Sequence, residues 1–335
     1  MALDFMGVKP AAGRIIHDSL KLDGVHVPIV LAAGAADGRV LVVHCAQHQT
    51  EYSGSAMIGQ LLAGLDLAAV RGLLVVLPLV NVPLILRTRL PQTFPAQAES
   101  NQANKGTVRA NINRVWPGVE DGTWNERLAW TLSHEVFVKA DAVLDFHSCR
   151  LCDAGFSSYV VSSRPSRDIA LAFGLEMIDE TPEEGYFPGQ LHSRVPIELG
   201  VPAILVEMSP TSGQVSWAAM QQARRGVLNV MKHLGMLEGT PQLPPRQVIF
   251  HRRVEKVLFS AGQIGFAVTY CRPGQVVKQG DLLAEVRSFK DFSVLESHRA
   301  PCAGALASCG PHPSHVVLPG EELATMEPGA EIIDN

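Results

Sequence analysis

Short apolar runs alternate along the first part of the chain with longer stretches whose apolar residues recur at helical spacing. The runs lie at residues 29–32, 40–43, 73–79, 142–146, 159–161 and 203–206, and they are typical of strands buried on both faces. The longer stretches lie at residues 55–65, 124–139, 166–173 and 217–234. This alternation predicts an α/β fold, a mostly parallel mixed sheet with helices on both faces.

The pattern changes near residue 240, where Pro241, Pro244 and Pro245 lie close together. Such a stretch ends a helix and forms a stiff connector. Beyond it, short strand-like runs at residues 254–260, 266–270, 282–286 and 305–307 are separated by Gly and Pro, which is typical of a small all-β unit. We therefore predict a large domain over residues 1–240 and a small β domain over residues 246–330.

Two stretches of this second part echo each other, residues 272–281 and residues 316–322, each with Gly and an acid before an apolar pair. The echo resembles the barrel-sandwich fold of lipoyl and biotinyl carriers. Those carriers present a modifiable lysine at a hairpin tip. Lys290 lies near a possible tip, but its neighbours Phe289 and Asp291 do not match the carrier pattern, so a carrier role is disfavoured.

Composition favours an enzyme that acts on small molecules. The 335 residues, 47% of them hydrophobic and 18% charged, suffice for a substantial core. The net charge of -5 and the 6% of aromatic residues give no basic stripe for nucleic acid. No window approaches the roughly 20 apolar residues of a membrane span, and the N-terminus lacks a leader pattern. We expect a cytoplasmic protein without a membrane partner, and homo-oligomerisation stays open.

Six cysteines are spread over the chain, at positions 45, 149, 152, 271, 302 and 309. In a chain of this length they do not predict a dense disulfide framework, and we expect them to be reduced. Cys149 and Cys152 form a C-x-x-C motif with no matching pair nearby. A redox role for this motif is disfavoured, although its nearness to His147 could place it beside a pocket.

Polar residues follow the ends of several predicted strands. His48 and Glu51 come after residues 40–43, Asn81 after residues 73–79, His147 after residues 142–146, and Glu207 closes residues 203–206. In open α/β sheets ligands bind at the carboxyl ends of the strands. We therefore expect these residues to converge on one crevice.

Two imidazoles and one carboxylate are a typical ligand set for hydrolytic zinc, which keeps a further position open for water. We predict one zinc ion per chain, held by His48, Glu51 and His147. His44 ends the strand run and is more consistent with a core or supporting histidine than with a ligand. Glu207 is the candidate for proton transfer, and its alternative is a structural acid paired with an arginine.

Five segments carry a specific resemblance. They are residues 46–54, which hold His48 and Glu51, residues 81–83 with Thr88-Arg89, the Asn-Ile-Asn-Arg and Pro-Gly of residues 111–118, Asp145-Phe146-His147, and Glu207. In this order and followed by a β module, they resemble the succinylglutamate desuccinylase/aspartoacylase family, relatives of the zinc carboxypeptidases. The resemblance covers nearly the whole chain. One departure is Gln49, which stands where the family has glycine.

The resemblance implies a zinc-dependent amidohydrolase that deacylates a small N-acyl amino acid. Glu207 would act first as base and then as acid, and Arg89 would stabilise the oxyanion. Arg87 competes for that role if its segment is extended. The remaining roles follow the same motifs: Asn113 and Arg114 would bind a substrate carboxylate, and Asp145 would orient a ligand imidazole.

Several alternatives stay open. Asn111, where other relatives have Asp, slightly favours a resemblance to relatives that deacetylate N-acetylated diamino acids, but the acyl group is undetermined. A zinc carboxypeptidase acting on peptides and a non-catalytic small-molecule-binding relative are the competing functions. Residues 90–110 form an insertion that is either a lid or a solvated loop. We expect the β domain to cover the crevice, without assigning Tyr270, Arg287 or His312 to it.

Overall fold

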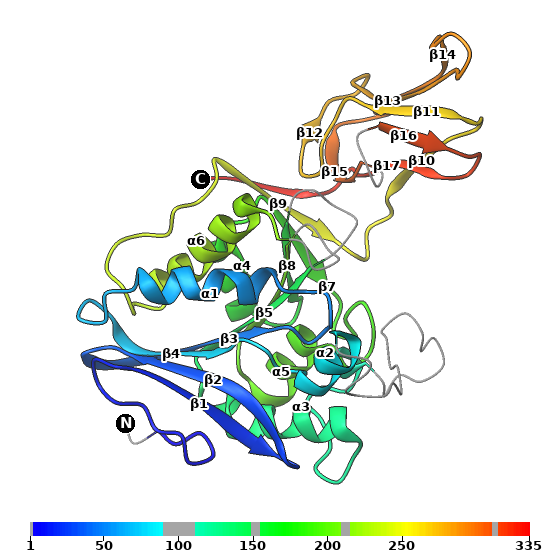
Figure 1. Cartoon of the computed structure of the whole chain (residues 1–335). Helices are drawn as coiled ribbons and strands as arrows, with labels where there is room; N and C mark the ends of the chain where they lie inside the picture. Colours follow the sequence, from blue (N-terminus) through cyan, green and yellow to red (C-terminus); the bar gives the residue numbers. More distant parts are fainter. Residues whose placement is uncertain (1–2, 90–110, 149–154, 209–214, 310–313) are drawn as a thin grey trace.

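A ten-stranded mixed sheet forms the centre of the protein (Figure 1). The computed structural model describes residues 3–89, 111–148, 155–208, 215–309 and 314–335. In sheet order the strands are β1 (Ile15–Leu22), β2 (Val25–Ala33), β4 (Arg71–Leu77), β3 (Ala36–Cys45), β5 (Ala142–Ser148), β8 (Ala203–Met208), β6 (Phe156–Val160), β7 (Met177–Thr181), β9 (Arg246–His251) and β18 (Glu331–Asp334).

Parallel pairing dominates the middle of this sheet. Strands β4, β3, β5 and β8 run parallel, as do β6, β7 and β9, whereas β8 and β6 are antiparallel. The outer strands β1, β2 and β18 pair antiparallel. Asp23 and Gly24 connect β1 to β2 with positive φ angles of 50° and 77°, which suits the right-handed twist of a two-residue hairpin. The predicted mixed α/β sheet is therefore confirmed.

Helices cover both faces of the sheet (Figure 1). One face carries α1 (Ser53–Ala63), α4 (Arg164–Phe173) and α6 (Trp217–His233), and the other carries α3 (Trp124–Glu135) and α5 (Leu191–Leu199). Each face buries its own apolar cluster. On the face that carries α1, α4 and α6, a Cβ on Gly226 of α6 would lie 2.3 Å from the Phe173 ring of α4. Helices α4 and α6 can therefore pack this closely only because residue 226 is glycine. Each predicted helix and strand overlaps an observed element.

The segment after β4 is helical rather than extended. Helix α2 (Val82–Arg89) begins directly after Asn81. Arg87 therefore lacks the strand alternation that would place it on the same face as Arg89. The side chains of both arginines, the whole 90–110 insertion, and Cys149 and Cys152 lie outside the described residues.

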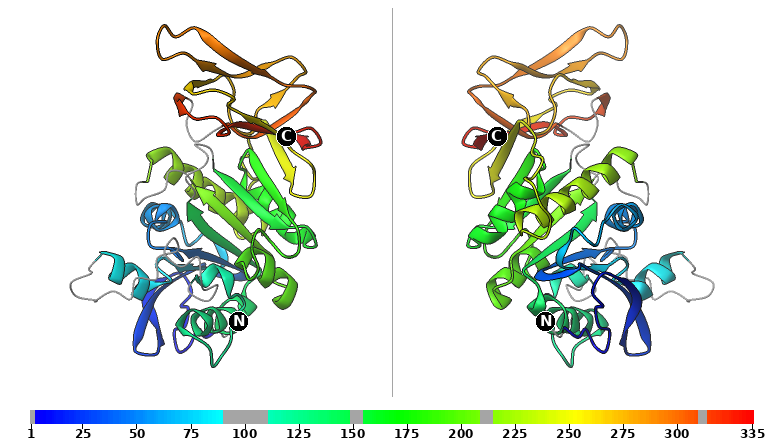
Figure 2. Two further views of the ribbon diagram at one scale, coloured as in Figure 1. Left: turned by 90° about the vertical axis from the view of Figure 1, so that its right-hand side faces the viewer. Right: turned by 90° about the vertical axis from the view of Figure 1, so that its left-hand side faces the viewer.

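The C-terminal part forms two four-stranded antiparallel sheets, stacked at one end of the molecule (Figure 2). In sheet order, one holds β10 (Val257–Ser260), β17 (Glu322–Glu327), β15 (Gly304–Ser308) and β12 (Val276–Val277), and the other holds β14 (Val294–Arg299), β13 (Leu282–Arg287), β11 (Gly265–Thr269) and β16 (Ser314–Val317). Strands β9 and β18, which flank this unit in the sequence, belong to the large sheet. The chain thus leaves and re-enters the large sheet around the small β unit.

Within the described ranges, no helix is long and apolar enough to cross a membrane.

Candidate metal centre and substrate pocket

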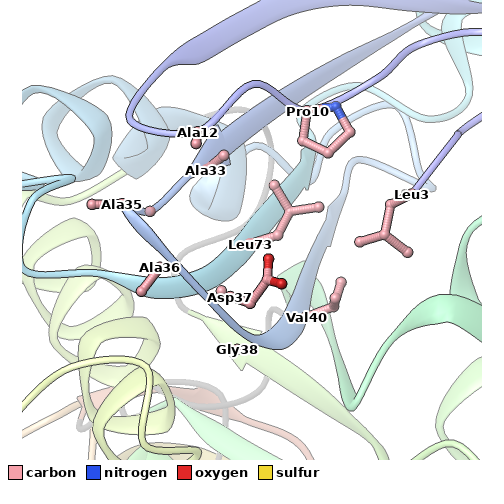
Figure 3. A pocket seen from close by; sticks show the side chains of 12 residues that line it. Leu3, Pro10, Ala12, Ala33, Ala35, Ala36, Asp37, Gly38, Val40 and Leu73 are labelled. Carbon is pink, nitrogen blue, oxygen red and sulfur yellow. The ribbon is translucent and has the colours of Figure 1, made fainter. Parts of the chain in front are cut away.

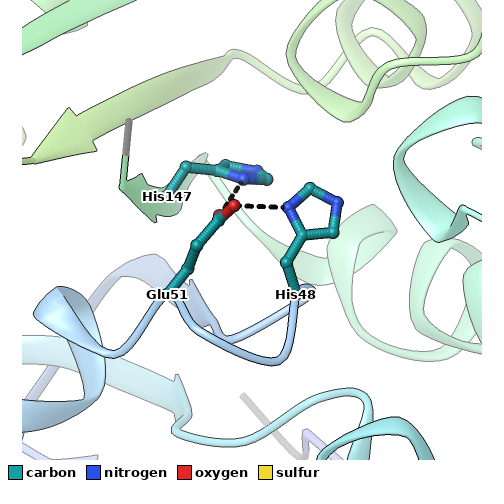
Figure 4. Close-up of side chains that lie close together, drawn as sticks. All are labelled: His48, Glu51 and His147. Carbon is teal, nitrogen blue, oxygen red and sulfur yellow. Dashed lines mark hydrogen bonds and ion pairs between the residues drawn. The ribbon is translucent and has the colours of Figure 1, made fainter. Parts of the chain in front are cut away.

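His48, Glu51 and His147 meet at the carboxyl ends of β3 and β5 (Figure 4). The Nδ1 atom of His48 lies 2.8 Å from Glu51 Oε1, and the Nδ1 atom of His147 lies 2.8 Å from Glu51 Oε2. One ligand atom from each residue lies within 4.8 Å of the others. The structure therefore brings together the three residues that the sequence proposes as ligands, in an arrangement that could hold one metal ion.

The turn after β3 positions His48 and Glu51. Ala46 adopts a φ of 58°, which bends the chain as it leaves the strand. Helix α1 then starts against β5, because a Cβ on Gly54 would lie only 2.5 Å from the Phe146 Cβ atom. This close approach requires glycine and brings Glu51, three residues earlier, against His147 at the end of β5.

Both imidazoles have a partner on the ring nitrogen that points away from Glu51. His147 Nε2 lies 2.9 Å from Asp145 Oδ2, and His48 Nε2 lies 3.1 Å from Asn111 Oδ1. Metal-binding histidines usually donate their second N–H to such an oxygen, which fixes the tautomer and the ring orientation. The geometry therefore fits Nδ1 ligation by both histidines.

Gln47, which no sequence motif singles out, connects the metal centre to Trp116, two residues after the Asn-Ile-Asn-Arg segment. Its amide nitrogen donates to both carboxylate oxygens of Asp145, at 2.8 and 2.7 Å. Its Oε1 atom accepts a hydrogen bond from Trp116 Nε1 at 3.0 Å. The side chain is fully buried, and only its place beside His48 signals a role. His44 Nδ1 also lies 2.8 Å from Asp145 Oδ1, so His44 helps to hold the carboxylate that contacts His147.

Charge at the centre is balanced by close pairing. Burial by itself would raise the pKa values of Glu51 and Asp145, but attraction from the neighbouring histidines outweighs it and lowers both. Burial likewise opposes the charge on His147, yet Asp145 and Glu51 raise its pKa well above its usual value. Both carboxylates thus stay ionised, as a cation site requires.

A cavity of about 590 Å³ opens over the three residues. Glu207, Asn113 and Arg114 also line it. Glu207 on β8 is the register partner of His147 on β5, so the strand pairing itself sets the acid beside the imidazole. The side-chain oxygen of Asn113 accepts a hydrogen bond from Leu191 N at 3.0 Å, which ties the segment to the start of α5.

Two arginines in this cavity stack on aromatic rings. The Arg114 guanidinium lies 4.0 Å from the centre of the Phe187 ring, and that of Arg252 lies 3.6 Å from the centre of the Tyr186 ring. Stacking holds a guanidinium in place while its edge can still bind an anion. Arg252 directly follows β9, and the sequence analysis missed it because no motif surrounds it.

A second cavity, of about 170 Å³, lies beside the strand ends of β2 and β3 (Figure 3). Its lining is almost entirely apolar or glycine, with Asp37 as its single titratable residue. It therefore lacks the grouped polar side chains that the cavity at the metal centre has.

The catalytic-domain model of the succinylglutamate desuccinylase/aspartoacylase family matches residues 37–234. These residues make up more than half of the chain and include every residue of the metal centre. The chain belongs to this family. The resemblance read from the sequence motifs is thereby confirmed, and membership supports a hydrolase of the deacylase type.

Relatives span nearly the whole chain. The N-alpha-acetyl-L-2,4-diaminobutyric acid deacetylase of Halomonas elongata is 24% identical over 310 residues, which cover 88% of this chain and 84% of the relative. The product-bound structure of the ectoine utilization protein EutE (DoeB) from Ruegeria pomeroyi has a TM-score of 0.65 at 23% identity, covering 93% and 94% of the two chains.

A family member from Rhodobacter sphaeroides, a succinylglutamate desuccinylase/aspartoacylase, has a TM-score of 0.64 at 21% identity, with 95% of this chain and 94% of that chain covered. At these identities the structural likeness establishes a shared fold. The fold includes the C-terminal sheets as well as the large mixed sheet, because the coverage is nearly complete.

Proposed function

We propose that this protein is a zinc-dependent hydrolase of linear amide bonds, which cleaves a small N-acyl amino acid into a carboxylic acid and a free amine. The observation that carries this proposal is the set of His48, Glu51 and His147, whose ligand atoms lie within 4.8 Å of one another, beside the carboxylate of Glu207. Two nitrogens and one carboxylate oxygen are the donors that hydrolytic zinc prefers. The activity of the Halomonas elongata relative supports the substrate class.

Zinc at this centre would supply acidification of water and polarisation of the amide carbonyl. The protein's own residues do the rest of the work. Glu207 lies in the cavity next to His147, where it takes a proton from the attacking water and delivers it to the departing amine nitrogen. One carboxyl group thus serves as base and then as acid.

Arg114 and Asn113 bind the substrate carboxylate. The Arg114 guanidinium stacks on Phe187, and its Nη1 donates to the Asn113 carbonyl oxygen. In this proposal its other edge, Nε and Nη2, offers two parallel N–H groups to a planar anion. The oxygen of the Asn113 amide is engaged by Leu191, so its nitrogen is the donor. Arg89 at the end of α2 stabilises the developing oxyanion in this proposal, and Asp145 orients His147 through Nε2.

The size of the cavity supports a small substrate. About 590 Å³ lies within the range usual for small-molecule sites. Arg252, which directly follows β9 of the large sheet, lines the cavity. We propose in addition that the β domain covers the crevice and excludes long peptides. We also propose that the large domain is arranged as in zinc carboxypeptidases.

Metal analysis and a substrate panel test the proposal together. We expect one zinc per chain, loss of turnover after chelation and recovery on adding zinc. The zinc-loaded protein should release amine from N-acetyl or N-succinyl amino acids, aspartate derivatives included, and leave peptides intact. Cleavage of peptides alone would indicate a carboxypeptidase, and a zinc-loaded protein that binds these compounds without turnover would be a non-catalytic relative.

A further inference from the structure

Two cysteine thiols of the C-terminal unit are in contact. The Sγ atoms of Cys271 and Cys309 lie 3.3 Å apart, and both cysteines are free. Cys271 follows β11, in one small sheet, and Cys309 directly follows β15, in the other. The pair therefore sits where the two sheets meet and joins positions 38 residues apart in the sequence.

We propose that Cys271 and Cys309 are a modification site, which forms a reversible intramolecular disulfide by exchange with a small-molecule disulfide. This inference does not depend on the proposed hydrolytic function. A disulfide needs a sulfur separation of about 2.05 Å, so the two sulfurs must approach by roughly 1.2 Å from the observed contact. Side-chain rotation at a strand end can supply that movement.

The two thiols differ in access, which sets the order of the steps. Cys309 is only 5% exposed, whereas Cys271 is partly exposed. The hydrogen bond from Cys309 also lowers the pKa of the Cys271 thiol, which increases the share of reactive thiolate. Cys271 is therefore the attacking thiol and Cys309 the resolving one.

The exchange proceeds through two successive displacements at sulfur. The Cys271 thiolate attacks one sulfur of the small disulfide, forms a mixed disulfide and releases one small thiolate. The sulfur of Cys309 then attacks Cys271 Sγ and expels the second small thiolate, which takes up the proton of Cys309. Two protein thiols are oxidised by two electrons, and the small disulfide is reduced to two thiols.

Peptide mapping of the full-length, folded protein tests the proposal, with oxidised glutathione as the probe. Trypsin places Cys271 in the peptide of residues 257–278, and both Cys302 and Cys309 in the peptide of residues 300–335. Because Cys302 and Cys309 share a peptide, the mapping is done on the Cys302→Ser variant, which keeps both cysteines of the proposed pair. We expect a link between the two peptides that dithiothreitol reverses. Cys149 and Cys152 fall on other peptides and are read separately.

The matched variants distinguish the outcomes. Cys309→Ser should stop at a stable glutathione adduct on Cys271, and Cys271→Ser should show neither the adduct nor the link. The oxidised protein should melt higher by roughly 5 °C, because the link constrains the unfolded chain. A link that requires Cys302, one that forms only in urea, or no reaction of folded Cys271 would overturn the proposal.

Discussion

His147 and Glu207 are register partners on the adjacent parallel strands β5 and β8. Neighbouring strands lie about 4.8 Å apart, and paired residues point to the same face. The proposed base is therefore set beside a proposed metal ligand by backbone hydrogen bonding rather than by a loop. Asp145 and Leu205, two residues earlier on the same strands, are paired in the same way. A site built on paired strands keeps its geometry when surrounding loops move.

Replacement of Glu207 by glutamine should separate chemistry from metal binding. Glu207→Gln keeps the size of the side chain but cannot accept the proton of water, so we expect kcat to fall by about 100-fold or more. Zinc content should stay near one per chain, because the three ligands are intact. The control is Glu198→Gln, which changes a partly exposed acid of α5 that pairs with Arg194 and should leave kcat unchanged. An unaltered kcat in Glu207→Gln would remove Glu207 from its proposed role.

The sequence predicts those parts of the structure that are coded locally. Strands buried on both faces, such as β3 and β5, are visible as continuous apolar runs. Strand β1 mixes exposed and buried positions, so it gives no such run, and β9 follows the prolines that predict a new domain. Its membership of the large sheet comes from pairing with β7, a contact that no local pattern encodes.

The candidate site likewise contains some residues that the local sequence marks and others that only tertiary contacts bring in. Residues at strand ends, such as His147 and Glu207, can be found because a polar residue after an apolar run is conspicuous. Gln47 could not be found, because its role depends on contacts with Trp116 and Asp145, which lie 69 and 98 positions away. Arg252 was missed for the same reason, since it enters the cavity only through the pairing of β9.

A double-mutant cycle should reveal the connection through Gln47. Gln47→Leu leaves the buried Trp116 N–H and the Asp145 carboxylate each without one partner, which we expect to cost about 1–3 kcal/mol of unfolding free energy. Trp116→Phe removes the same N–H. Because both variants break one shared bond, the double variant should be less destabilised than the sum, by about 0.5 kcal/mol or more. Additive losses in urea unfolding would show that the two side chains act independently.

Gly189 should matter for substrate affinity. Its φ is +74°, and an added Cβ would lie 2.0 Å from the backbone oxygen of Arg114. Gly189→Ala must therefore shift the segment that carries Arg114, and we expect KM to rise by about tenfold, together with a loss of stability.

Gly200 provides a matched control for this substitution. It closes the other end of α5 with a φ of +69°, and an added Cβ there would meet nothing within 4 Å. Gly200→Ala should lose about 1 kcal/mol of stability from backbone strain and keep its KM. Equal KM values in the two alanine variants would contradict the role of the Gly189 contact.

Metal binding should release a proton near neutral pH. Asp145 and Glu51 hold the pKa of His147 well above its usual 6.5 in the metal-free protein, so the imidazole is protonated at pH 7 and must lose that proton to become a ligand. By linkage, this raised pKa stabilises the metal-free fold below about pH 6.5, and the contribution disappears as pH rises through the folded-state pKa. The lowered pKa values of Glu51 and Asp145 act oppositely: their contribution is present above about pH 4.5 and is lost as pH falls.

Calorimetry can measure this release directly. Zinc titrations at pH 7 in buffers of different ionisation enthalpy should give about one proton released per zinc bound, and zinc affinity should increase from pH 6 to pH 8. His134→Ala, an exposed histidine of α3 whose Nδ1 lies near the Trp130 carbonyl oxygen, is the control and should release the same number. Heat signals independent of the buffer would mean that His147 is already neutral before zinc binds. The close pairing of His147 with two carboxylates would then not control metal binding.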